Sequence, residues 1–223
     1  MGDGPFHPFA LPPRPPNLTQ AFPPDRLGAM KSIVVVCTGN ICRSPMGEVV
    51  LAKRLARAGI EAEVTSAGVS SEESGHPIDR RAANVLRDSG YDVPSHRAHR
   101  ISDDELRSSD LILAMTTGHA RRLRSMAEAA GADLGKIRLW REFDGTTPPS
   151  ENGVFGPGGA LAPDGSHAHE AGKRHSGSDL YWSDGALDVP DPYYDPIEGF
   201  QATLATVERG ADGIVSWLRA REG

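Results

Sequence analysis

A loop of ten residues, 36–45, limits what this chain can fold into more than any other stretch. Its sequence is VCTGNICRSP; it continues the β-branched run 33–36 and precedes residues 46–58, whose apolar positions recur at helical spacing. The pattern predicts a buried strand, a tight loop and an amphipathic helix in that order. We expect Gly39 to let successive N–H groups of the loop converge on one point.

The start of the predicted helix is suited to an anion. We expect Pro45 at the first helical position and Ser44 as the N-cap. Free N–H groups and the positive end of the helix dipole would then face the loop, where a tetrahedral oxyanion such as phosphate fits. Arg43 can hold two of its oxygens. Cys37 ends the strand among the same donors, so the loop predicts a thiolate nucleophile facing a bound phosphate.

The motif CTGNICRSP, with the sequence DPYY at 191–194, closely resembles the low-molecular-weight protein tyrosine phosphatases. The resemblance covers residues 31–143 and continues from 188 to the C-terminal region. It implies an α/β fold, a three-layer sandwich with a four-stranded parallel twisted sheet and a phosphate-binding loop after the first strand. The sequence pattern agrees, because four short apolar segments alternate with predicted helices, which favours a parallel sheet with its ligand at the carboxyl ends of the strands. These segments are residues 33–36, 62–67, 110–115 and 137–140.

The resemblance also implies the residues of the site. Cys37 would be the nucleophile, Arg43 the phosphate ligand, and Asp191 the acid that protonates the leaving oxygen and then activates water. Asp188 is the second candidate for the acid. The remaining residues expected to bind phosphate or substrate are Thr38, Gly39, Asn40, Ile41, Cys42, Ser44, Tyr193 and Tyr194.

Two further roles follow from the resemblance. Asn40, Ser66 and His96 would form a hydrogen-bonded shell that holds the loop rigid. In the family, a second loop cysteine can form a reversible disulfide with the nucleophile, which gives Cys42 a redox role. The alternative for Cys42 is a small packed residue.

The expected reaction is hydrolysis of phosphotyrosine through a cysteinyl-phosphate, without cofactor or metal. His167, His169 and His175 do not carry a ligand pattern of defined spacing. Two alternatives on the same fold are an arginine phosphatase and an arsenate reductase that depends on a low-molecular-weight thiol. The thioredoxin-linked kind of arsenate reductase needs a cysteine pair downstream, and the chain has no cysteine after Cys42.

The chain divides by composition. Residues 1–30 contain eight of the 18 prolines and no periodicity, so we expect a disordered tail before a phosphatase domain at 31–223. A low-complexity insertion at about 144–188, rich in Gly and Pro, has no counterpart in the family pattern. We expect it to be a mobile loop that buries no core.

Charge and cysteine content restrict location and partners. The net charge of −6 argues against nucleic acid, and two cysteines five positions apart do not make a disulfide framework. With no apolar run of membrane-spanning length, we expect a cytoplasmic protein that is a monomer or a weak homo-oligomer. Its expected partners are phosphotyrosine proteins and a cognate tyrosine kinase.

Two positions depart from the family pattern. Glu72 stands where an aromatic wall of the substrate cleft is frequent, and Thr116 stands where an acidic residue is common. The peptide preference of the chain therefore does not follow from the resemblance.

Overall fold

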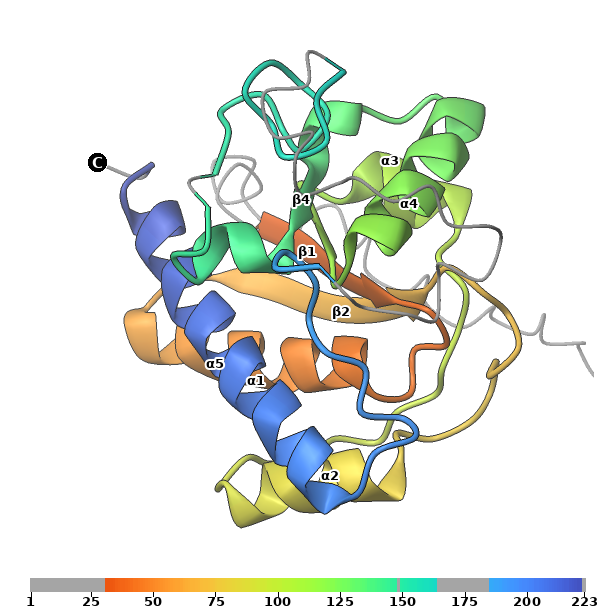
Figure 1. The fold of residues 1–223 in the computed structure, drawn as a ribbon, viewed down its shortest axis with the longest axis vertical. Coiled ribbons are helices and arrows are strands. Elements are labelled where there is room, and N and C mark those ends of the chain that lie inside the picture. The colour runs from red at the N-terminus through yellow and green to blue at the C-terminus, as the bar shows by residue number, and fades with distance from the viewer. Residues whose placement is uncertain (1–30, 148, 164–184, 222–223) are drawn as a thin grey trace, which may run out of the picture. The chain divides into compact units, whose positions relative to one another are not determined.

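The computed structural model describes residues 31–147, 149–163 and 185–221. The predictions for the tail 1–30 and for His167, His169 and His175 lie outside these ranges. In the described part, four strands form one parallel sheet in the order β2-β1-β3-β4 (Figure 1). The strands are β1 (Lys31–Cys37), β2 (Ala62–Gly68), β3 (Leu111–Ala114) and β4 (Ile137–Leu139). The expected parallel sheet is confirmed.

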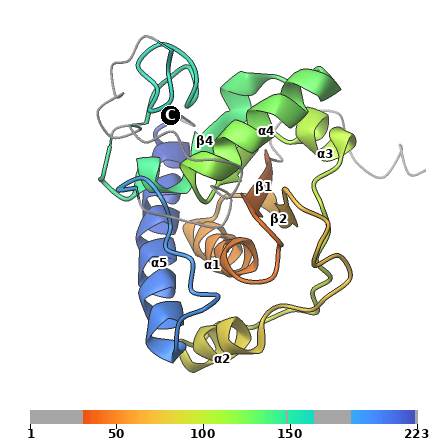
Figure 2. The ribbon, with the colours of Figure 1, turned by 45° about the vertical axis from the view of Figure 1, so that its right-hand side comes forward.

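Helices cover both faces of the sheet, as Figures 1 and 2 show together. On one side of the sheet, α1 (Arg43–Ala58), α5 (Ile197–Arg219) and α2 (Arg80–Asp88) share one core, with α2 packed on α5 and α1; on the other side lie α3 (Asp103–Ser108) and α4 (Thr117–Ala130). Two 3₁₀ helices, η2 (Leu134–Lys136) and η3 (Trp140–Phe143), flank β4. The three layers match the predicted sandwich.

The first strand lies between the two cores. Ile33 and Val35 pack with α1 and α5, whereas Val34 and Val36 point to the core under α3 and α4. All four side chains are fully buried. A strand covered on both faces needs apolar side chains at consecutive positions, which explains the unbroken β-branched run.

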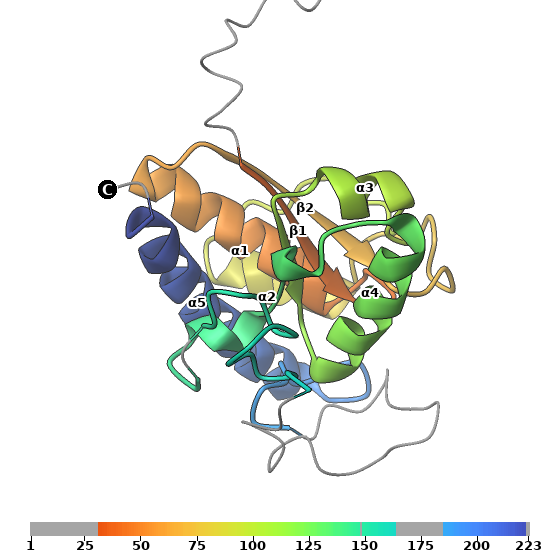
Figure 3. The ribbon, with the colours of Figure 1, turned by 90° about the horizontal axis from the view of Figure 1, so that it is seen from above.

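The carboxyl ends of the strands meet at one edge of the sheet. Strands β1 and β2 run side by side, seen from above in Figure 3, and Cys37 is paired with Gly68 at their ends. The loop after β1 passes so close over Gly68 that a Cβ there would lie 2.6 Å from the carbonyl oxygen of Thr38. This edge therefore carries the loop that the sequence singled out.

Two helix starts differ from the prediction. Helix α1 begins at Arg43 with Cys42 as its N-cap, so Ser44 is not the N-cap and Pro45 is not the first helical residue. The hydroxyl of Ser44 instead contacts the Cys37 sulfur and the Ala67 carbonyl. For the last helix, the proline at 196 predicts a first helical residue at Pro196, but α5 begins one residue later, at Ile197, with Pro196 as its N-cap.

The described part of the predicted insertion packs on the protein, so the prediction that this segment buries no core is wrong. Val154 is fully buried, and Ala160 and Leu187 are 7% and 6% exposed in the core under α4. The N–H of Val154 donates to the carbonyl of Ile137 at 3.1 Å. The physical reason is that β4 is an edge strand, whose unpaired backbone groups the segment covers. Residues 164–184 are outside the described ranges.

Among the described residues, no helix combines the length and apolar character that crossing a bilayer requires.

Candidate active site

A pocket of about 350 Å³ opens where β1 ends. Nine of the predicted site residues line it, although they come from two segments about 150 positions apart: Cys37, Thr38, Gly39, Ile41, Cys42, Arg43, Asp191, Tyr193 and Tyr194. Glu72 and Glu73 complete the lining. The fold thus brings the cysteine loop and the DPYY segment into one cavity.

Cys37 is 3% exposed, and its sulfur lies 3.0 Å from the Ser44 hydroxyl oxygen. That hydroxyl accepts a hydrogen bond from Asn40 Nδ2 at 3.0 Å and has the Ala67 carbonyl 3.2 Å away. Ser44 has a single proton to donate. When Cys37 is a thiol, the proton can go to the carbonyl. When it is a thiolate, the same proton can turn to the sulfur.

Asn40 provides the sharp turn of the loop. Its φ is 60°, which makes it the one non-glycine residue with a left-handed backbone in the described part of the chain, whereas Gly39 is not left-handed. The left-handed turn therefore falls on Asn40 and not on Gly39. A side chain at Gly39 would still obstruct the loop, because a Cβ there would lie 2.8 Å from Glu73 Cγ.

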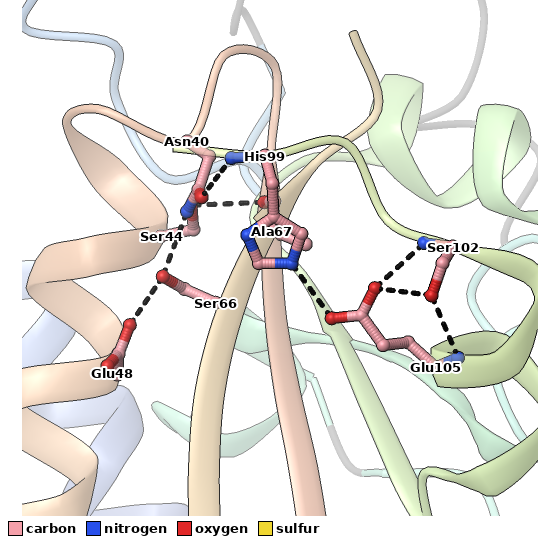
Figure 4. Close-up of polar contacts among 8 residues, drawn as sticks. All are labelled: Asn40, Ser44, Glu48, Ser66, Ala67, His99, Ser102 and Glu105. Atoms are coloured by element: carbon pink, nitrogen blue, oxygen red, sulfur yellow. Dashed lines mark hydrogen bonds and ion pairs between the residues drawn. The ribbon is translucent and has the colours of Figure 1, made fainter. Parts of the chain in front are cut away.

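Hydrogen bonds from three directions offset the strain at Asn40, and Figure 4 shows those that its side chain makes. Its Nδ2 also donates to Ser66 Oγ at 2.9 Å, and Ser66 in turn donates to Glu48 on α1. Its Oδ1 accepts the N–H of His99 at 3.1 Å. Its carbonyl oxygen lies 2.7 Å from His96 Nε2. Asn40, Ser66 and His96 thus lie where the resemblance placed them.

The same network contains residues that sequence reasoning missed. Glu48 anchors Ser66, and His99 is itself held by Glu105 at 2.9 Å. Glu105 and Ser102 form the capping box of α3, which the S-x-x-E pattern at 102–105 indicates as a structural feature. In the sequence these residues are isolated polar positions. Nothing in their order along the chain shows that they come together around Asn40.

An ion pair spans the pocket. Arg43 is 2% exposed, and its Nη2 lies 2.6 Å from Oδ2 of Asp191, whose side chain is 20% exposed. The same Nη2 donates to Thr38 Oγ1 at 3.5 Å. The guanidinium that would hold a phosphate is thus joined to the carboxylate that would act as the acid.

Asp188, the second candidate for the acid, does not line the pocket. Its Oδ1 accepts the N–H of Thr117 at 2.7 Å, and burial raises the pKa of its carboxyl group. The next residue, Val189, donates its N–H to the carbonyl of Met115 at 2.8 Å. Asp188 therefore ties the segment before α5 to the end of β3.

Two tyrosines form the outer wall of the pocket. Tyr193 and Tyr194 are 39% and 88% exposed, with their rings edge to face at 4.9 Å. Arg81 on α2 donates to the carbonyl oxygens of Tyr193 at 2.9 Å and Asp195 at 3.2 Å, and it pairs with Asp79 at 3.0 Å. Arg81 is a further residue that sequence reasoning missed.

Part of the pocket lining is acidic. Glu72 and Glu73 form this part, and Glu73 Oε2 lies 2.6 Å from His76 Nδ1. The negative charge of Glu73 raises the pKa of Tyr193. Glu72 is in the wall where the family often has an aromatic residue, so this wall offers charge instead of a ring surface.

Cys42, the second cysteine of the loop, is buried. Cys42 is 4% exposed, and burial raises the pKa of its thiol far above the ordinary range, with the charge of Asp79 adding to the effect. It is therefore a neutral thiol at physiological pH.

His119 lies behind the loop and was also missed. It is fully buried, and its two ring nitrogens lie 2.8 Å from Thr38 Oγ1 and 2.9 Å from Thr116 Oγ1. Thr116 Oγ1 also accepts the N–H of His119 as the N-cap of α4. Burial, and then the Arg43 charge, hold the pKa of His119 well below its usual value.

In the described ranges, no cluster of three or more histidine, cysteine, aspartate or glutamate side chains is arranged to hold a metal ion.

A parallel sheet whose first strand leads into a C-x5-R loop at a helix N-terminus is the architecture of a class of cysteine-dependent phosphatases. Residues 32–163 match the sequence profile described as low molecular weight phosphotyrosine protein phosphatase. The chain belongs to this family. The match includes residues 144–163, so the expectation that the family has no counterpart for this part of the segment 144–188 is wrong.

Individual proteins agree with the family match. The low molecular weight protein-tyrosine phosphatase A of Mycobacterium tuberculosis is 34% identical over 85% of this chain and 92% of its own length. The low molecular weight protein-tyrosine-phosphatase of Streptomyces coelicolor is 33% identical over 84% and 93%. A structure of the Bacillus subtilis arginine phosphatase YwlE, with a phosphorylated active-site serine, is 22% identical and has a TM-score of 0.58 over 84% of this chain and 95% of that one. This last likeness shows the shared fold only.

Proposed function

We propose that this chain hydrolyses phosphotyrosine in proteins through a cysteinyl-phosphate, with Cys37 as nucleophile. Family membership makes it a protein-tyrosine phosphatase. The observation that carries the assignment of roles is the pocket itself, where Cys37, Arg43 and Asp191 line one cavity with an aromatic wall. A pocket of about 350 Å³ with convergent polar groups suits a phosphorylated side chain.

In the first step, the thiolate of Cys37 attacks phosphorus in line with the tyrosine oxygen. The S–P bond forms as the P–O bond to tyrosine breaks. Loop N–H groups and Arg43 stabilise the equatorial oxygens. The 3.0 Å contact with Ser44 supports a hydroxyl that donates to the sulfur whenever the sulfur is negative.

Asp191 supplies the proton in the same step. As a carboxylic acid it protonates the leaving tyrosine oxygen, and as a carboxylate it then takes a proton from the water that breaks the S–P bond. Arg43 Nη1 is buried without a hydrogen-bond partner in the described structure and can bind a phosphate oxygen, whereas Asp191 must leave its ion pair with Nη2 to reach the leaving oxygen. Asp191 thus moves from the guanidinium to the leaving oxygen.

The aromatic wall supports tyrosine as the substrate side chain. Tyr193 and Tyr194 present ring surface at the mouth, with Ile41 lining the same cavity. A phenyl ring gains contact energy against such an aromatic and apolar surface. Arginine phosphatase and thiol-dependent arsenate reductase remain the alternatives on this fold.

The test compares phosphotyrosine peptide, phosphoarginine peptide and arsenate with glutathione as the thiol, side by side on the full chain. We expect turnover of the phosphotyrosine peptide to exceed the other two by at least about a hundredfold. The Cys37→Ser variant should lose about 10⁵-fold or more in kcat and still bind inorganic phosphate. Equal or faster turnover of the phosphoarginine peptide would show that the chain is an arginine phosphatase instead.

We also propose a redox role for Cys42. If peroxide converts Cys37 to a sulfenic acid, attack by Cys42 expels water and gives a disulfide that thiols reduce. The neutral state of Cys42 makes this attack slow, so protection depends on the closeness of the two residues around one pocket. A Cys42→Ser variant should recover less activity after peroxide and thiol treatment. Full recovery would remove the role.

For the setting of the enzyme, we propose a cytoplasmic protein that acts as a monomer or weak homo-oligomer on proteins phosphorylated by a cognate tyrosine kinase. A reducing compartment keeps both buried thiols free, which supports this location. We propose that catalysis resides in residues 31–223 and that residues 1–30 and the segment around 144–188 lie outside the chemistry. Removal of 1–30 should leave kcat on a phosphotyrosine peptide within about twofold.

A further inference from the structure

We propose that His119 is a positioning residue that sets the Arg43 guanidinium through the Thr38 hydroxyl. The chain of contacts starts at Thr116, passes through the imidazole at 2.9 and 2.8 Å, and reaches Thr38. Thr38 then accepts from Arg43 Nη2 at 3.5 Å. His119 itself does not line the pocket.

The burial of His119 makes this chain directional. A neutral imidazole has one donor and one acceptor nitrogen, so one hydroxyl must donate to the ring and the other must accept from it. Both hydroxyl oxygens are therefore held at defined points. His119 has no exposed surface on which water could replace Thr38. Loss of the imidazole would leave the Thr38 hydroxyl without this support.

The same turn also holds the segment that carries the acid. Met115 accepts the N–H of Val189 at 2.8 Å, and Thr117 donates its N–H to Asp188 at 2.7 Å. Residues 115–119 therefore contact the phosphate-binding loop on one side and the approach to Asp191 on the other. This turn therefore contacts both segments whose side chains, Arg43 and Asp191, form the 2.6 Å ion pair.

The experiment uses the full chain and two readouts, the Kd for inorganic phosphate by calorimetry and kcat on a phosphotyrosine peptide. His119→Phe keeps a ring but removes both hydrogen bonds, and Thr38→Val removes the hydroxyl at nearly constant shape. Each substitution should raise the Kd for phosphate about tenfold. The Kd of the double variant should be no more than about twofold above that of the single variant that binds phosphate more weakly. Thr38→Ser should restore most of the binding that Thr38→Val loses.

Two results would overturn the inference. One is a lower melting temperature for His119→Phe with unchanged phosphate Kd and kcat, which describes a histidine that only fills the core. The other is a double variant whose losses multiply, which removes the link through Thr38.

If His119→Phe does not fold, Thr116→Val and Thr116→Ser replace it, since only serine keeps a hydroxyl at Nδ1. Weaker phosphate binding by the valine variant supports the inference, and equal binding overturns it. The kcat readout rests on the proposed phosphatase function, whereas the phosphate Kd does not. A wild-type chain that binds phosphate but leaves phosphotyrosine intact would refute the proposed function alone.

Discussion

The two halves of the pocket are held in different ways. The loop 37–44 is buried and cross-linked by side chains from α1, β2 and the 96–99 segment, with Asn40 at the centre. The segment 188–195 is tied at separate points, through Met115, Thr117 and Arg81, and its tyrosines face solvent. The phosphate cradle is therefore held by buried side-chain hydrogen bonds, whereas the half that carries the acid has a more exposed side chain at Asp191 and ends in exposed tyrosines.

This difference matches the chemistry each half is proposed to perform. Stabilising charge on an oxyanion benefits from donors that do not rearrange. An acid that first pairs with Arg43 and then reaches the leaving oxygen must change its position. The following variants test this difference between loop 37–44 and segment 188–195.

Asp191→Asn should have the largest effect. Loss of the acid should lower kcat on a phosphotyrosine peptide about 10²- to 10⁴-fold and much less on an aryl phosphate with a good leaving group. The neutral amide should compete less for Arg43, so inorganic phosphate should bind several-fold more tightly. Steady-state kinetics with both substrates and calorimetry measure this.

Asp188→Asn is the matched control, because Asp188 bonds Thr117 outside the pocket. It should show the same loss on both substrates. A leaving-group dependence in Asp188→Asn and none in Asp191→Asn would exchange their roles.

Asn40→Ala should loosen the rigid half. It removes three side-chain hydrogen bonds and leaves a β-carbon in the left-handed region, which we expect to cost about 2–4 kcal/mol in the free energy of unfolding. Denaturant unfolding measures this. Asn40→Gly separates the two causes, since glycine accepts this φ and should be about 1 kcal/mol more stable than the alanine variant. Equal stability of the two would show that backbone strain contributes nothing here.

His119 should make stability depend on pH. Its pKa is well below 6.5 in the folded chain and near 6.5 when unfolded, so the unfolded state binds more protons between these values. Stability should therefore fall as pH drops below about 6.5, by up to about 1.4 kcal/mol per pH unit. In His119→Gln this contribution should vanish. Unfolding free energies at pH 7 and 5.5 test it, and an unchanged slope would contradict it.

Arg81→Ala should have the smallest effect. The Arg81 side chain is 37% exposed, and its loss removes two donors to the backbone at Tyr193 and Asp195. The segment 188–195 should then become less ordered. We expect KM for a phosphotyrosine peptide to rise about two- to fivefold with little change in stability. Arg80→Ala, its exposed neighbour on α2, is the control. The same change in both variants would exclude support of the tyrosine wall by Arg81.

Much of the architecture could be predicted because it depends on local pattern. The β-branched run, the motif after it and the capping box at Ser102 and Glu105 each correspond to an observed element. Ser44 was misplaced as the N-cap because its hydroxyl contacts the Cys37 sulfur and the Ala67 carbonyl, and Ala67 is 23 residues away. The prediction of a mobile loop was wrong for the segment 149–163, because this segment packs along the edge strand β4 and bonds its backbone.

By itself, the sequence determined that Cys37, Arg43 and Ser44 share one loop, since they are close in the chain and a strand and a helix fix its ends. Only the tertiary structure decided that Asp191 reaches Arg43 across 148 positions, that Asp188 turns away to Thr117, and that His119 lies behind Thr38. The reason is physical: local spacing sets which residues a loop presents, but contacts between distant segments depend on how the sheet and helices pack. Those contacts leave no periodic trace along the chain.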